Sequence, residues 1–215
     1  MRKELLIAAA SLLLALSSVA NADEGPTYKG PLSPAERAFV RSIQSDLNAR
    51  FPHAADAERQ GYVRYTGVDE TGAISYANMH WTSEDTRHPS QLWYDVNGTL
   101  LGADFSRPMT GPARPHAFGV NPGRWYGFDD HIHYVRLNPK TGAGQYDLYI
   151  MPADFRKSGG DPKHPTAADL VKLHKAKSTA QVVRVFDFPA VWDLIVWVKP
   201  NPKGAFAVKN PLVKT

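Results

Sequence analysis

Beyond residue 32, apolar residues first recur at helical spacing in the segment that begins at Ser33. Ser33 and Glu36 have the spacing of a capping box, and a proline stands between them at the first helical position. Phe39, Ile43 and Leu47 follow at intervals that place them on one face of a helix. The pattern predicts an amphipathic helix of about four or five turns. Its apolar face requires a sheet to cover.

Stretches rich in Val, Ile, Tyr and Trp come next, separated by Gly, Pro, Asn and Asp. They predict strands over residues 61–65, 73–81, 91–96, 99–105, 125–137, 145–151, 181–188, 191–198 and 205–208. Asn97 and Gly98 form the strongest short-range hairpin signal in the chain. Because most connections have hairpin length, we expect the strands to pair mainly antiparallel.

A second helical pattern begins after Thr166, and its one apolar face consists of Leu170, Val171, Leu173 and Ala176. The order of elements predicts an α+β fold, with a mostly antiparallel curved sheet on which the N-terminal helix and this second helix pack. A closed β-barrel with peripheral helices is the alternative. Residues 106–123 are rich in proline and glycine, so they are either a functional loop or an ordered crossover.

The N-terminus has the pattern of a secretory signal peptide. Arg2 and Lys3 precede an apolar run over residues 5–16, and small residues flank a cleavage site between Ala22 and Asp23. We therefore expect a periplasmic or secreted protein. The predicted organisation is a signal peptide at 1–22, a mobile leader at 23–32, a single α+β domain at 33–208 and a basic C-terminal tail at 209–215.

Composition narrows the functional classes. The chain has no cysteine, so its core must stabilise the fold without disulfides, and thiol catalysis and cysteine-based metal sites are excluded. The formal net charge is +4, without a dense run of Lys and Arg, so we expect no nucleic-acid partner. No apolar stretch after the cleavage site is long enough to span a membrane.

One short polar cluster is a candidate metal site. Asp129, His131 and His133 alternate along a predicted strand, so their side chains share one face. His116, in the proline-rich segment, is a candidate further ligand. Imidazole and carboxylate ligands suit a divalent ion such as Zn, Cu, Ni or Fe(II). A sheet face of hydrogen-bonded histidines without a metal is the alternative interpretation.

Aromatic residues are dense along the predicted strands. Trp81, Trp93, Trp125 and Tyr126 are candidates to line a ligand site, because such side chains combine a large apolar surface with a polar group. The same residues are also common in the cores of sheets.

The chain lacks the nucleophile elbow, the zinc-protease motif, the phosphate-binding loop and the dinucleotide fingerprint. The sequence therefore predicts an exported protein that binds a small ligand or a metal ion in a cavity of its sheet. Two alternatives remain, a metal-dependent enzyme that uses the histidine and aspartate cluster, and a structural or protein-interaction role in the envelope.

Overall fold

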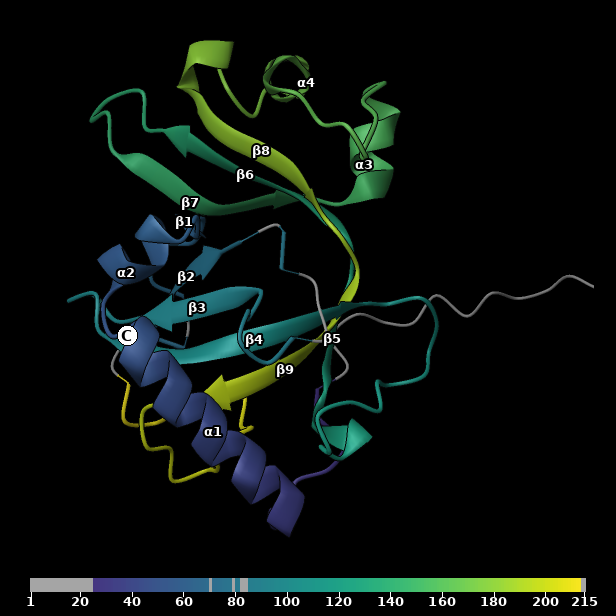
Figure 1. Ribbon diagram of the computed structural model, residues 1–215. Coiled ribbons are helices and arrows are strands. Elements are labelled where there is room, and N and C mark those ends of the chain that lie inside the picture. Colours follow the sequence, from purple (N-terminus) through teal and green to yellow (C-terminus); the bar gives the residue numbers. More distant parts are fainter. Residues whose placement is uncertain (1–24, 70, 79, 82–84, 214–215) are drawn as a thin grey trace, which may run out of the picture.

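The computed structural model describes residues 25–69, 71–78, 80–81 and 85–213. The predicted signal peptide, residues 1–22, lies outside the described residues. Within the described part, the chain has an α+β fold with two antiparallel sheets, and its strands do not close into a barrel (Figure 1). The predicted fold class is confirmed, although the strands are divided between two sheets.

The strands are β1 Val63–Arg64, β2 Ile74–Ala77, β3 Gln91–Tyr94, β4 Leu100–Pro108, β5 Tyr126–Phe128, β6 His131–Leu137, β7 Gly144–Ile150, β8 Val182–Phe188 and β9 Val191–Trp197. The larger sheet has six strands in the order β1-β2-β3-β4-β9-β5, and the smaller has three in the order β7-β6-β8. Neighbouring strands are antiparallel. The predicted hairpin joins β3 to β4, and Gly98 has a φ of +74°, which favours glycine.

A bent two-stranded ribbon connects the two sheets. Strand β5 continues into β6 through residues 129–130, and β8 continues into β9 through residues 189–190. Phe128 and Val191 are register partners in the larger sheet, immediately beside the bend. Both chains of the ribbon therefore change sheet at the same place, as the ribbon drawing shows (Figure 1).

This bend corrects the prediction of one strand over residues 125–137. The chain forms two strands there, and they belong to different sheets. Pro189 lies in the opposite chain of the ribbon, at the same bend. Because proline has no N–H to donate, it interrupts the hydrogen-bond ladder between the two sheets.

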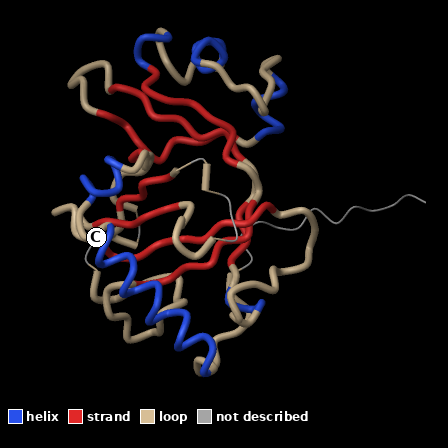
Figure 2. The backbone as a smooth tube through the Cα atoms, in the orientation of Figure 1, coloured by secondary structure: helices blue, strands red, loops and turns tan. Residues whose placement is uncertain are grey.

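Helix α1, Pro34–Arg50, covers one face of the larger sheet (Figure 2). The predicted capping box is present, because the Ser33 hydroxyl accepts from the Glu36 N–H and the Glu36 carboxylate accepts from the Ser33 N–H. Phe39, Ile43 and Leu47 are buried in the main hydrophobic core. Full burial of each such side chain contributes about 1.5–3 kcal/mol. The helix predicted from these residues is confirmed.

Helices α3, Pro152–Lys157, and α4, Ala167–Lys172, cover the outer face of the smaller sheet. Ile132 of β6 packs with Phe155 and Leu170 in a separate core. Helix α4 is the predicted second helix and is capped by Thr166. Helix α3 and α2, Ala54–Arg59, have six residues each, too few to show helical periodicity in the sequence. The 3-10 helices are η1, Pro122–Arg124, and η2, Thr179–Gln181.

The chain segments at both ends of the described region pack on the larger sheet. Residues 25–32, the described part of the predicted leader, include three carbonyls that accept hydrogen bonds from Arg124. The predicted strand at 205–208 is absent, because the chain turns there and Phe206 packs against α1. Val213 is buried in a small core on the opposite face. None of the described helices is long and apolar enough to cross a membrane.

Candidate functional site

The inner face of the larger sheet carries polar side chains where a sandwich would normally be apolar. Side chains alternate along β4, so Asp104 and Ser106 point away from α1, whereas Phe105 points into the main core. The same alternation in β9 places Asp193 on the inner face, and Asp193 is the register partner of Ser106. Two carboxyl groups on adjacent strands therefore form the floor of the space between the sheets.

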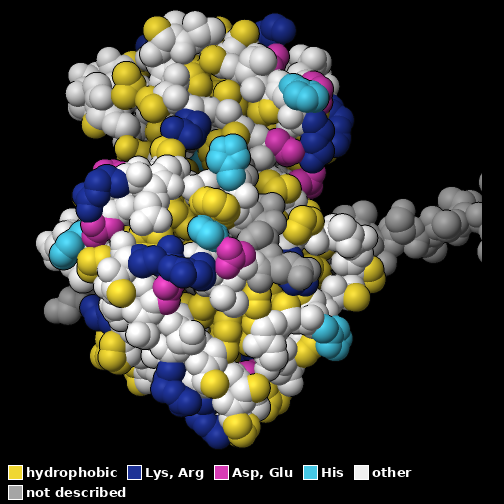
Figure 3. Space-filling view, in the orientation of Figure 1, with side chains coloured by type: hydrophobic (Ala, Val, Ile, Leu, Met, Phe, Trp, Pro, Cys, Tyr) yellow, Lys and Arg dark blue, Asp and Glu magenta, His cyan; other side chains and the backbone are white. Residues whose placement is uncertain are grey.

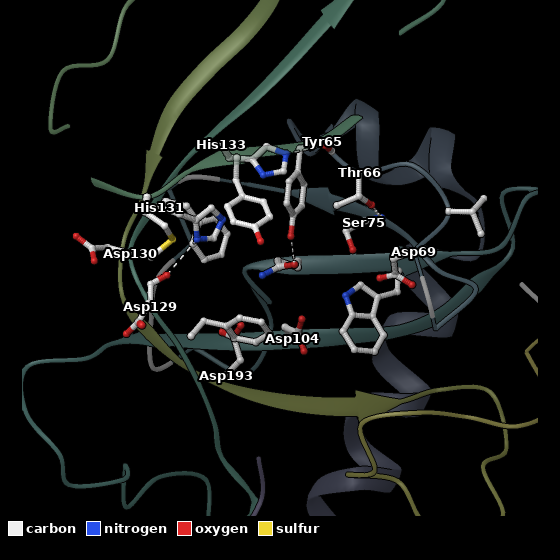
Figure 4. A pocket seen from close by; sticks show the side chains of 17 residues that line it. Tyr65, Thr66, Asp69, Ser75, Asp104, Asp129, Asp130, His131, His133 and Asp193 are labelled. Carbon is white, nitrogen blue, oxygen red and sulfur yellow. Dashed lines mark hydrogen bonds between the residues drawn. The ribbon is translucent and has the colours of Figure 1, made fainter. Parts of the chain in front are cut away.

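That space is a cavity of about 650 Å³. Figure 4 shows Asp104 and Asp193 on the floor, with Tyr65, His131 and His133 opposite. The space-filling view shows the molecule narrowing between the two sheets, with hydrophobic and histidine side chains along the narrow part (Figure 3). The cavity is lined by Tyr65, Thr66, Val68, Asp69, Ser75, Gln91, Trp93, Asp104, Phe128, Asp129, Asp130, His131, His133, Tyr149, Met151, Phe188 and Asp193.

The two floor carboxyl groups are almost completely buried, with exposed fractions of 3% for Asp104 and 1% for Asp193. Among the described residues, Oδ1 of Asp104 and both carboxyl oxygens of Asp193 make no hydrogen bond of normal geometry. A buried polar group without a partner costs about 1–3 kcal/mol, and more when it is charged. Most buried polar groups in folded proteins are paired, so three such oxygens at one place require an explanation.

Burial raises the pKa of Asp193 to about 7, and the adjacent Ser106 hydroxyl opposes part of this change. Burial also raises the pKa of Asp104 well above its ordinary value, and the negative charge of Asp193 raises it further. Two neighbouring carboxylates in a dry site cannot both ionise easily. Near neutral pH the pair therefore holds at least one proton.

Hydrogen bonds hold the other polar groups of the floor in place. The Ser90 hydroxyl donates to the Asp104 carbonyl at 3.0 Å and lies 2.5 Å from the Ser106 hydroxyl. The Tyr65 hydroxyl donates to the Gln91 side-chain oxygen. These bonds stabilise the positions of side chains around the carboxyl pair.

His131 and His133 lie side by side on the opposite wall, with ring centroids 6.0 Å apart. The alternation predicted for these residues is present, since both line the cavity. Nε2 of His133 is 3.0 Å from the Tyr65 carbonyl oxygen, and the His131 ring stacks on Phe188 at 4.6 Å. Burial lowers the pKa of His133 to about 4 and also lowers that of His131. Both imidazoles are therefore neutral at pH 7.

The less buried part of the cavity lining is also acidic and partly apolar. It includes the half-buried Asp69, Asp129 and Asp130, and also Tyr149 and Met151, which are 63% and 40% exposed. With the floor pair, five aspartates line the cavity, and none of the described lining residues is a lysine or an arginine. The electrostatic potential inside is therefore negative.

The predicted metal ligands are only partly brought together. Asp129, His131 and His133 line the cavity, whereas His116 is exposed in the proline-rich segment and is not among the lining residues. Within the described ranges, no group of three or more His, Asp or Glu side chains is arranged to hold a metal ion. The metal site stays a prediction.

The four predicted aromatic residues of the ligand site lie in different places in the structure. Trp93 lines the cavity. Trp125 is fully buried in the main core, Trp81 packs against that core and stacks on His88, and Tyr126 packs against Phe128. The structure therefore brings one of the four predicted aromatic residues to the cavity.

The floor carboxyl pair was missed in the sequence. The signal was present, because Asp193 interrupts the apolar strand Val191–Trp197 and Asp104 follows four small or apolar residues in β4. A charged residue inside a strand that is otherwise fully buried is costly, and it marks a position with a special role.

Comparison with protein-family models, with curated proteins and with solved structures finds no match. The function is therefore inferred from the cavity itself.

Proposed function

We propose that this chain binds a small polar organic molecule in the cavity between its two sheets. The observation that carries the proposal is the set of three carboxyl oxygens of Asp104 and Asp193 that are buried, line the cavity and have no hydrogen-bond partner among the described residues. A ligand that donates hydrogen bonds to these oxygens would offset the cost of burying them.

The size and lining of the cavity support the same function. Ligand sites commonly enclose about 300–1,000 Å³ and combine apolar walls with a few polar groups. Here Tyr65, Trp93, Phe128 and Phe188 supply aromatic surface, and the carboxyl pair supplies the polar groups. Because the floor strands belong to a sheet backed by α1, the polar groups are held in fixed positions.

Ligand binding is expected to raise the melting temperature of the purified protein, because a ligand that binds only the folded state stabilises it by mass action. We would measure thermal unfolding with putrescine, tyramine, D-glucose, L-glutamate and adenosine, and we expect a saturable increase with at least one of them. Native mass spectrometry of the freshly purified protein would detect a retained ligand.

Ser75→Phe is the test variant, because Ser75 is buried and lines the cavity, so a phenyl ring there would occupy ligand space. Ser178→Phe is the matched control, because Ser178 is exposed and is not among the lining residues. The thermal shift should disappear in the first variant and persist in the second. A shift that persists in Ser75→Phe, or the absence of any shift or retained molecule, would contradict the proposal.

Thermal unfolding also tests whether the cavity binds a metal ion. A rise in melting temperature with Zn, Ni or Cu that is lost when His131 and His133 are both replaced by Gln would favour a metal ion as the ligand. An equal rise in the double variant would place metal binding elsewhere.

We also propose that the protein works outside the cytoplasm, in the periplasm or the medium, after cleavage between Ala22 and Asp23. The proposal rests on the charged and apolar pattern of residues 1–22. Intact-mass measurement of the exported protein should give a chain that begins at Asp23. Recovery of the uncleaved chain from the cytoplasm alone would contradict it.

A further inference from the structure

We propose that the ligand of this cavity is an organic cation, a primary amine or a guanidinium compound, whose N–H groups donate to the carboxyl pair Asp104–Asp193. This inference rests on the proposed function and specifies the chemical class of its ligand.

The charge of the cavity is the first argument. Five aspartates line it, without lysine or arginine among the lining residues. Lys163, whose charge interacts with the lining residue Asp130, is paired with Asp187 at 2.9 Å. A cavity whose charged lining residues are all acidic attracts cations and repels carboxylates and phosphates.

The floor supplies the second argument. Asp104 and Asp193 are side chains of adjacent strands, and three of their oxygens are buried without partners among the described residues. An ammonium group has three N–H donors and a guanidinium has five, and neither is an acceptor. Such a group matches the oxygens of ionised carboxylates, which accept hydrogen bonds and do not donate them. Its positive charge also removes the repulsion that prevents both carboxyl groups from ionising together.

The opposite wall supplies the third argument. His131 and His133 of β6 face the carboxyl pair together with Tyr65 (Figure 4). Because burial keeps both imidazoles neutral at pH 7, they do not repel a cation. The aromatic rings of the walls can also contact a cation through their faces, a favourable interaction when water is excluded.

Charge and donors together distinguish this ligand class from a neutral polyol. A sugar or alcohol would donate hydrogen bonds to the floor but would leave the negative potential of the cavity uncompensated. A cation donates the hydrogen bonds and also neutralises part of the negative charge. Binding should also release protons, because the cation lowers the pKa values of the two carboxyl groups that bind it.

Isothermal titration calorimetry at pH 7.5 tests the inference with matched pairs of probes. Putrescine is compared with 1,4-butanediol, and tyramine is compared with its neutral alcohol analogue, 4-hydroxyphenethyl alcohol; agmatine supplies the guanidinium. We expect at least one cation to bind at least tenfold more tightly than its neutral counterpart. Titration in buffers of different ionisation enthalpy should show proton release.

Asp104→Asn and Asp193→Asn should each weaken binding of that cation at least tenfold, since each removes a charge that contacts it. Asp154→Asn is the control, because Asp154 is an exposed carboxylate on α3 that pairs with Lys157. It should bind the cation as the parent does. Circular dichroism verifies that each variant is folded.

The outcomes separate the two proposals. Equal binding of an amine and its neutral counterpart, or unchanged affinity in both floor variants, would overturn the cation inference. If the neutral probes bind and Ser75→Phe abolishes their binding, the proposed ligand-binding function is supported and the cation inference is not. If no probe binds and no molecule is retained, both the ligand-binding function and the cation inference are contradicted. Binding of Zn with no amine binding would overturn the inference in favour of a metal ion.

Discussion

Asp193→Asn is expected to be more stable than the parent protein at pH 8, in the absence of ligand. The pKa of Asp193 in the folded protein is raised to about 7, above its ordinary value of 3.8. A carboxyl group with a raised pKa binds its proton more strongly in the folded state. Its contribution therefore lowers stability progressively as the pH rises from about 4 to about 7. The asparagine amide cannot ionise, so the variant avoids this loss, which we expect to be about 2–4 kcal/mol.

Urea denaturation at several pH values measures this difference. The variant and the parent should have similar stabilities at pH 4, where the parent carboxyl group is protonated, and they should diverge up to pH 8. Because other titrating groups are common to both proteins, the difference isolates the floor pair. Asp154→Asn, on the surface, should show no such divergence. A constant difference between pH 4 and pH 8 would show that Asp193 does not titrate as a buried group.

This stabilisation together with lost ligand binding would identify the carboxyl pair as a functional feature. Groups that serve the fold destabilise the protein when they are removed, whereas binding groups are often retained at a cost in stability. Asp193 would belong to the second kind.

Glu36→Ala is expected to destabilise the protein by about 3–5 kcal/mol, because it leaves a buried arginine without its charged partner. Glu36 and Arg124 are both almost completely buried, with the Arg124 Nε 3.1 Å from a carboxylate oxygen of Glu36. The same carboxylate accepts from the backbone N–H groups of Ser33 and Asn121. One side chain therefore caps α1 and fixes η1 and the preceding loop against it.

Chemical denaturation of Glu36→Ala, Glu36→Gln and Asp154→Ala would measure the effect. Glutamine retains an acceptor and should cost less than alanine. Asp154→Ala breaks an exposed pair with Lys157 and should cost much less than either. A Glu36→Ala variant as stable as Asp154→Ala would show that the Glu36–Arg124 pair contributes little.

Glu36 also predicts a loss of stability in acid. Burial alone would raise its pKa, but hydrogen bonds from Arg124, Ser33 and Asn121 outweigh this and hold the pKa below 4.5. A carboxyl group with a lowered pKa stabilises the folded state above its unfolded pKa, and this contribution is lost as the pH falls through the folded value. The acid loss below about pH 4.5 should be smaller in Glu36→Gln than in the parent.

Local signals were sufficient to predict much of the fold. Ser33 and Glu36 marked the start of α1, and Asn97-Gly98 marked the β3–β4 hairpin, because these signals act over a few residues. The division into two sheets could not be predicted, since it depends on a bend at residues 129–130 opposite Pro189. The chain over residues 125–137 reads as one strand, and the predicted break between 188 and 191 does not by itself indicate a second sheet.

The candidate site could be predicted only in part, for a related reason. His131 and His133 are neighbours in one strand, so alternation alone places them on one face. Asp104 and Asp193 are far apart in the sequence and become neighbours only because β9 returns to pair with β4. Their pairing depends on the order of strands, which hairpin signals do not determine.

The bent ribbon has a consequence for how this architecture can diversify. Since Phe128 and Val191 are already register partners, residues 129–190 leave and rejoin the larger sheet at one point. In topological terms, the smaller sheet and its two helices are an insertion into a β-hairpin. A short turn between Phe128 and Val191 would close that hairpin and retain every strand pairing of the floor. Exchange of the inserted segment would therefore keep the same acidic floor and change the residues that face it. On the proposed function, the ligand would change with them.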